Sequence, residues 1–290
     1  MMKLYAISDL HLHYEENREA LSGIPDSRDH WIILAGDVGE QAHDLKFALD
    51  ILTSRFGKVF WVPGNHELWT MSEDGARGQA KYEELLRLCA TYNEGLSRDE
   101  LKVVTPEDPF TIWPGEGPPC VIAPLFNLYD YSFRPDHIAS YKEAFQWALD
   151  TSIMCNDEEL LHADPHQDKV AWCEERLAIS RRRLEEVNKD PATRNHQLVI
   201  INHYPLRYEH VRLFRIPRFS LWCGTKKTEN WHKDYNARVV VYGHLHIRAT
   251  DWIEGVRFEE VSLGYPQHWR QGMPIRHYMR EILPGPEEPV

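Results

Sequence analysis

Short apolar segments bounded by turn residues recur along the chain, and segments with helical periodicity separate them. Several of these apolar segments are uninterrupted, as in WIILAG and RVVVYG, which is typical of strands buried on both faces of a layered sheet. The predicted strands lie at 3–8, 31–36, 58–63, 101–104, 120–125, 197–202, 238–243 and 258–263. Helical periodicity marks 40–55 and 76–94, and Leu45, Leu49 and Leu52 share one face of the first helix. The pattern predicts an α/β fold.

Residues 136–190 interrupt the succession of strands with two or three amphipathic helices. These helices form either a layer that packs on a sheet or a lid over a site, and the sequence favours neither. Because no flexible linker flanks them, we expect one domain over residues 1–284 with a helical insertion at about 136–190. The chain ends in PGPEEPV, and we expect residues 285–290 to be a disordered tail.

Composition narrows the class of protein. The formal net charge of −12 argues against a chain that coats nucleic acid or binds an anionic membrane surface. No apolar stretch is long enough to span a bilayer, and the first residues lack the pattern of a secretory signal. The cysteines show no CxxC spacing, which is typical of free thiols, so we expect a cytoplasmic protein. They are Cys89, Cys120, Cys155, Cys173 and Cys223.

Polar motifs follow five of the predicted strands, each where the apolar segment ends. Where two such residues are two positions apart, both can reach one ion, because alternate residues of a strand point to the same side. In chain order they are Asp9 and His11 in AISDLH, Asp37 in LAGDVG, Asn65, His66 and Glu67 in PGNHE, His203 in INHYP, and His244 and His246 in YGHLH.

Imidazole, carboxylate and amide oxygen are donors that suit Mn, Fe, Zn or Mg, and the set contains no thiolate. Seven of these residues are candidate ligands, which is too many for one ion, so the sequence predicts two ions that share a bridging carboxylate. The seven are Asp9, His11, Asp37, Asn65, His203, His244 and His246. The DxH spacing alone is weak evidence, because Asp164 and His166 repeat it elsewhere. The GNHE and GHLH motifs are much rarer by chance, and all five motifs occur in order.

The series DLH, GDV, GNHE, NH and GHLH resembles the signature of the calcineurin-like metallophosphoesterases. That resemblance implies a two-sheet β-sandwich core flanked by helices, with two metals at one sheet edge. It implies further that His66 acts at the leaving group and that Glu67 orients the His66 imidazole. By motif, Asp9, His11 and His246 would bind the first metal, Asn65, His203 and His244 the second, and Asp37 would bridge them.

The expected reaction is attack of a metal-bound hydroxide on phosphorus, with His66 assisting the departing alkoxide. No covalent enzyme intermediate is required, and the chain has no GxSxG, P-loop or GxGxxG motif. The alternative to an enzyme is a non-catalytic scaffold that kept the fold and lost its metals. Such scaffolds usually lack several ligands, whereas here none is missing.

Residues 206–234 hold seven Lys or Arg and three Asp or Glu, a local charge of +4 in an acidic chain. This stretch is either an ordinary solvated loop or a rim that attracts an anionic phosphoester or an acidic protein. Arg212 and Arg215 belong to it, and we expect Arg207 and Arg218, together with His13, to contact substrate.

A longer similarity, through WVPGNHELW, LYDYSF, SLWCGT, YGHLHI and FEEVSLGYP, resembles the bacterial phosphopantetheinyl hydrolases of this family. It implies a phosphodiesterase that removes 4′-phosphopantetheine from a serine of acyl carrier protein, with Mn and Fe as the metals. The alternative substrate is a small phosphoester such as a nucleotide.

Overall fold

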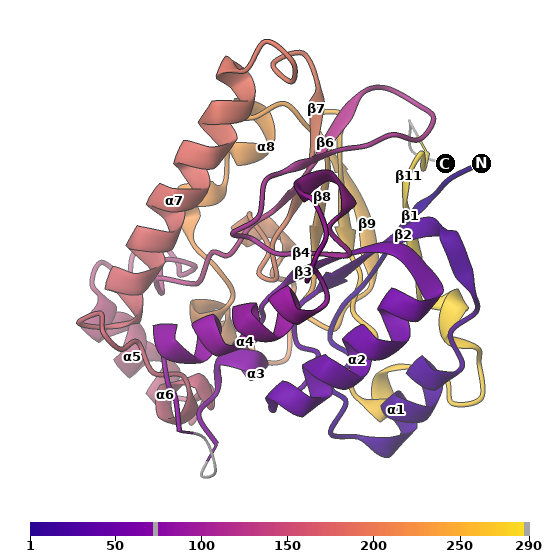
Figure 1. Cartoon of the computed structure of the whole chain (residues 1–290). Coiled ribbons are helices and arrows are strands. Elements are labelled where there is room, and N and C mark those ends of the chain that lie inside the picture. The colour runs from indigo at the N-terminus through magenta and orange to yellow at the C-terminus, as the bar shows by residue number, and fades with distance from the viewer. Residues whose placement is uncertain (72–74, 287–290) are drawn as a thin grey trace.

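The computed structural model describes residues 1–71 and 75–286, and it contains two mixed β-sheets with helices on their outer faces (Figure 1). The first sheet has the strand order β11-β1-β2-β3-β4, and the second has the order β5-β6-β7-β8-β10-β9. Only β5, β9 and β11 run antiparallel to their neighbours in the described part of the chain. The strands are β1 (Leu4–Ile7), β2 (Ser27–Ala35), β3 (Phe56–Val62), β4 (Val103–Val104), β5 (Thr111–Ile112), β6 (Cys120–Pro124), β7 (Gln197–Ile201), β8 (Ala237–Tyr242), β9 (Ala249–Ile253), β10 (Val256–Glu260) and β11 (Arg280–Leu283).

The helices cover the two sheets from outside, and the longest, α7, runs along the left edge of the molecule in Figure 1. They are α1 (Glu15–Ser22), α2 (Ala42–Arg55), α3 (Asn65–Leu68), α4 (Gln79–Thr91), α5 (Tyr141–Leu149), α6 (Asp157–Leu160), α7 (Lys169–Lys189) and α8 (Trp231–Asp234). Short 3-10 turns occur as well, among them η3 (Pro217–Trp222) in the loop that follows β7. In the described residues, no helix is both long and apolar enough to cross a bilayer.

Alternation along each strand explains why the sheets pack on each other. In β2, Ile33 and Ala35 point into a buried cluster that includes Val199 of the opposite sheet. Their neighbours Ile32 and Leu34 belong to a second cluster, which contains the apolar face of α2. Because successive side chains point to opposite faces, one apolar strand fills both layers. The predicted sandwich flanked by helices is therefore confirmed.

The carboxyl ends of the parallel strands of both sheets meet at one edge. The chain after β1 pairs with the chain after β10 through a parallel bridge between Ser8 and Ser262. The backbone N–H groups of Leu263 and Gly264 donate to the carbonyls of Ser8 and Asp9, at 2.9 and 3.0 Å. These bonds join the two sheets where the polar motifs lie.

All eight predicted strands are present, although only Val103–Val104 of the segment 101–104 is extended into a strand. Strands β5, β9 and β11 and helices α1, α3 and α8 were not predicted. The predicted insertion contains three helices, α5, α6 and α7, whereas the division into one domain over 1–284 stays a prediction. In the expected tail, Pro286 accepts a hydrogen bond from Arg257 at 3.2 Å, and residues 287–290 lie outside the described residues.

Candidate metal centre

Five loops at the shared edge bring the predicted ligands together. Within each of three groups, one ligand atom per residue lies within 4.8 Å of the others. Asp37 belongs to two of the groups, as a bridging carboxylate would. The groups are Asp9, His11 and His246; His11, Asp37 and His66; and Asp37, His203 and His244.

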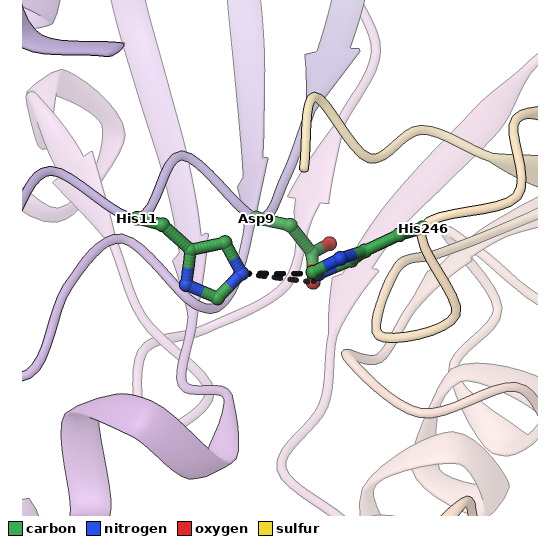
Figure 2. A group of neighbouring side chains, drawn as sticks. All are labelled: Asp9, His11 and His246. Atoms are coloured by element: carbon green, nitrogen blue, oxygen red, sulfur yellow. Dashed lines mark hydrogen bonds and ion pairs between the residues drawn. The ribbon is translucent and has the colours of Figure 1, made fainter. Parts of the chain in front are cut away.

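Figure 2 shows the first group, in which His11 and His246 face each other across the carboxylate of Asp9. The Nε2 atom of His246 lies 3.0 Å from Nε2 of His11 and 3.0 Å from Oδ1 of Asp9. The other carboxylate oxygen of Asp9 accepts from Ser8 Oγ at 2.5 Å and Ser262 Oγ at 2.7 Å. The two serines thus fix the carboxylate and leave Oδ1 directed at the two imidazoles.

The third group, together with Asn65, has buried metal-binding atoms that lack a hydrogen-bond partner among the described residues. His203 Nδ1 bonds the carbonyl of Ala35 at 2.9 Å, so its Nε2 is directed toward Asp37, with 3.4 Å between Nε2 and Oδ2. In the described structure, the Nε2 atoms of His203 and His244 and the Oδ1 atom of Asn65 make no hydrogen bond. Buried polar atoms normally have partners, and a cation would supply one to all three.

The backbone at this edge adopts a conformation that side chains other than glycine rarely take. Asp9, His11, Asp37, His244 and His246 all have positive φ, between 42° and 71°. Such strain is maintained at functional sites when the surrounding structure fixes it. Position 64 requires glycine because of a close approach: a Cβ there would lie 2.1 Å from Oδ1 of Asp37.

The charges of the cluster also fit a cation. Burial raises the pKa of Asp9 and of Asp37, but neighbouring imidazoles outweigh burial, so both pKa values lie below the ordinary range and both carboxylates are ionised. Burial and the nearby His203 lower the pKa of His244 to about 3, which leaves that imidazole neutral. Ionised carboxylates and neutral imidazoles are the forms that bind metal. For His203, burial lowers the pKa, but the Asp37 charge outweighs burial and raises the pKa to about 10; a cation beside Asp37 would favour the neutral imidazole instead.

His66 lies beside the centre, and its partner differs from the predicted one. Its Nε2 is 3.9 Å from Asp37 Oδ2, its Nδ1 is 3.6 Å from Glu40 Oε1, and its ring stacks on Trp69 with 3.7 Å between centroids. Burial lowers the pKa of His66, but the carboxylates of Asp37 and Glu40 outweigh it, so the pKa is raised.

The prediction that Glu67 orients His66 is wrong. The Glu67 carboxylate accepts from the backbone N–H groups of Asp37, Val38 and Gly64, at 2.9, 3.1 and 3.0 Å. Neighbours on the one-turn helix α3 project in different directions, so Glu67 fixes the two loops to each other while Glu40 stands beside the imidazole.

Asp157 is a residue of the centre that was not predicted. It comes from α6 of the insertion, is fully buried, and its Oδ1 accepts from Asn65 Nδ2 at 2.9 Å and from Trp69 Nε1 at 2.7 Å. The first bond fixes the amide of Asn65 so that its oxygen is the atom left free. An acidic residue at a helix start gives no sequence signal for this role, since the contact spans 92 positions.

Comparison with known proteins agrees with this centre. The family model described as calcineurin-like phosphoesterase matches residues 2–248. The chain belongs to the calcineurin-like phosphoesterase family. It is 45% identical over 98% of its length to the [acyl-carrier-protein] phosphodiesterase PptH of Mycobacterium tuberculosis, of which it covers 84%. The crystal structure of phosphopantetheinyl hydrolase (PptH) from that organism has a TM-score of 0.89 to this chain, with 43% identity, over 100% of this chain and 98% of that one. The resemblance predicted from the motifs is thus confirmed.

The arginines expected to contact substrate lie away from the centre of this family member. Arg207 pairs with Glu209 at 2.9 Å and donates to the carbonyl of Glu229. Arg218 donates to the carbonyl of Trp147 and lies over that indole ring. Both guanidinium groups are used within the fold, and neither residue lines the cavity at the centre, so we correct their assignment.

His13 also lies outside that cavity, with Nδ1 3.9 Å from Glu40 Oε1. His13 therefore lies beside Glu40, which in turn lies beside His66, and it does not line the cavity where we expected it to contact substrate.

A cavity of about 360 Å³ opens at the metal centre. Asp37, Asn65, His66, His244 and His246 line its polar end. The insertion contributes Met154, Cys155 and Asn156 to the wall, so it borders the candidate site directly. Of the two alternatives for the insertion, the covering role is the one that this contact favours.

Proposed function

We propose that this protein is a metal-dependent phosphodiesterase that removes 4′-phosphopantetheine from holo-acyl carrier protein. The observation that carries the proposal is the set of adjoining metal-ligand groups, with Asp37 in two of them, in a chain 45% identical over 98% of its length to an acyl-carrier-protein phosphodiesterase. Family membership supports the reaction class, and the relative's substrate supports the carrier protein.

Asp9, His11 and His246 would hold one ion, Asn65, His203 and His244 the other, and Asp37 both. The free atoms of Asn65, His203 and His244 support this assignment, because no described residue bonds them. The donors suit Mn and Fe, which we propose as the resident metals, and they also accommodate Zn or Mg. Two such ions, when bound, lower the pKa of a water and neutralise the phosphoryl oxygens.

The protein's own residues would handle the leaving group. A water releases one proton to the solvent and its oxygen adds to phosphorus, the bond from phosphorus to the serine oxygen breaks, and the serine alkoxide takes up a proton. His66 supplies that proton, since Asp37 and Glu40 raise its pKa and favour the imidazolium. Glu40 would act as a positioning residue through its charge, since its Oε1 lies 3.6 Å from Nδ1 of the ring, and Trp69 packs against the ring.

We also propose the cytoplasm as the compartment, because all five cysteines are free and buried.

The decisive experiment incubates Mn-loaded protein with purified holo-acyl carrier protein and follows the intact mass of the carrier. We expect loss of the whole phosphopantetheine group, and no loss with Asp37→Asn. An unchanged carrier, from a preparation that still hydrolyses an aryl phosphodiester, would contradict the carrier-protein substrate and favour a small phosphoester. A preparation that takes up no metal, measured by inductively coupled plasma mass spectrometry, would refute the proposal that the protein is a metal-dependent enzyme.

A further inference from the structure

The cavity at the metal centre has an apolar wall beside the candidate ligands. Leu213, Ile216 and Phe219, from the loop after β7, form this wall together with Met154 of the insertion. The Phe219 ring lies nearly parallel to the imidazole of His244, with 6.3 Å between centroids and 22° between planes. The apolar wall is therefore continuous with the candidate metal ligands.

Two of these side chains are exposed although they are large and apolar. Met154 is 41% exposed and Ile216 is 43% exposed. Apolar side chains gathered at the mouth of a pocket mark a binding surface more often than scattered ones do. A compact phosphoester has no apolar group that would cover such a wall.

Apart from the exposed Arg215, the positive charges of the same loop are used in contacts within the fold. Most of them pair with acidic groups from other elements, as Arg212 does with Asp251 at 2.9 Å and Lys226 with Asp136 at 2.7 Å. Lys227 contacts Asp130 and Glu174, and Lys233 pairs with Glu254 at 2.5 Å. The local net charge of +4 over residues 206–234 is thus largely balanced by acidic residues elsewhere in the fold. The apolar wall remains as the distinctive feature of the loop.

We propose that Met154, Leu213, Ile216 and Phe219 form the subsite for the pantetheine arm of the substrate. The inference rests on the proposed function, and it assigns the recognition of the arm to these residues. The occupant must present a phosphodiester at the metal end and an aliphatic chain along the wall. A pantetheine arm does so, because methylenes and a gem-dimethyl group adjoin its phosphate.

Asn156 adds a polar contact of the matching kind. It lines the same cavity, it is exposed, and its side-chain amide makes no hydrogen bond with the described residues. The pantetheine arm carries two amides, and one of them can pair with this side chain. An apolar wall with a single amide is the composition that a chain of methylenes and amides requires.

The wall is held in place by contacts between the loop and the insertion. Arg218 of η3 bonds the carbonyl of Trp147 in α5, and Trp222 donates to Glu158 of α6 at 2.6 Å. These contacts fix Ile216 and Phe219 relative to Met154, so the subsite is formed before the substrate arrives. Arg218 therefore holds η3 against α5 and does not contact substrate.

The test compares two substrates that share a leaving group and differ only in the arm. They are the 4-nitrophenyl ester of 4′-phosphopantetheine and methyl 4-nitrophenyl phosphate, both assayed with Mn-loaded enzyme. The variants are Ile216→Ser, Met154→Ser and their combination, chosen because both residues are partly exposed and tolerate truncation. The matched control is Leu96→Ser, which removes an equally exposed leucine outside the cavity.

We expect the wild-type protein to prefer the pantetheine ester in kcat/KM, and each truncation to reduce that preference on the order of tenfold. The double variant should also weaken binding of free 4′-phosphopantetheine in calorimetry, while Leu96→Ser keeps both values. A double variant that folds and retains the wild-type preference and affinity would overturn the subsite. Wild-type protein that cleaves neither ester would instead refute the phosphodiesterase function, so the two failures are distinguishable.

Discussion

Asp157→Ala tests whether the insertion supports the metal centre. The carboxylate accepts two hydrogen bonds in a fully buried position, from Asn65 and from Trp69. Removing it leaves two buried donors without an acceptor, and each costs about 1–3 kcal/mol of stability, which gives about 2–6 kcal/mol in total. The amide of Asn65 also loses the bond that directs its oxygen to the metal, and loss of such a support typically costs about 10–100-fold in metal affinity.

The assay is a titration of metal-free protein with Mn, read by calorimetry and by hydrolysis of an aryl phosphodiester, with thermal unfolding measured alongside. Asp157→Asn is the matched control, because its side-chain oxygen can accept both bonds and we expect only a small loss of affinity. Trp69→Phe removes one bond to Asp157 and leaves the bond from Asn65. If Asp157→Ala folded and bound Mn as tightly as the wild type, the reasoning would be refuted, as it would be if Asp157→Asn were equally impaired.

Three further predictions concern the centre. Asp37→Asn should lower the bound metal below the wild-type content and reduce turnover by at least about a thousandfold, measured by metal analysis and initial rates; near-normal turnover would contradict the shared carboxylate. His66→Ala should slow esters with alkoxide leaving groups more than nitrophenyl esters, and an equal loss on both would argue against a role at the leaving group. Glu40→Gln removes one of the charges that raise the pKa of His66, so the alkaline limb of the kcat profile should move to lower pH; an unmoved limb would exclude Glu40 as a positioning residue.

The sequence predicted the candidate ligands because each follows a buried strand. A strand that is apolar on both faces is recognisable without context, and the polar residue after it must lie at the edge of the sheet. The repeated spacing at Asp164 and His166 lacks such a strand. In the fold, Asp164 pairs with Arg77 and His166 with Glu175, away from the centre. The strand, more than the spacing, distinguishes the true motif.

The missed elements have physical reasons as well. Strand β5 has two residues, and β11 has four, two of them charged, so neither forms an apolar segment that periodicity detects. The pairing of β11 with β1 joins positions far apart in the chain, such as Leu4 with Leu283. Its place in the sheet depends on tertiary structure that no local pattern contains.

The errors in the site arise from side-chain direction. Adjacency suggests that Glu67 contacts His66, but the backbone after β3 turns into α3 and directs the carboxylate to three N–H groups. Glu40 is 26 positions from His66, and the fold alone brings it within 3.6 Å of the ring. The local charge of the 206–234 loop wrongly suggested a surface that attracts anions. Its acidic partners come from other elements, such as Asp251 on β9, and only the fold brings them near.

The insertion connects recognition of the substrate with the support of the metal centre. Met154 and Asp157 are three positions apart, and one lines the mouth of the cavity while the other bonds the amide of Asn65. The segment also pairs with the loop after α3, through a bridge between Trp69 and Leu161 and a 2.8 Å bond from Thr70 N–H to the carbonyl of Leu160. A change that shifts this segment must therefore move Met154 of the apolar wall and the amide of Asn65 together. The insertion is therefore part of the candidate site, because residues 154–157 make both contacts.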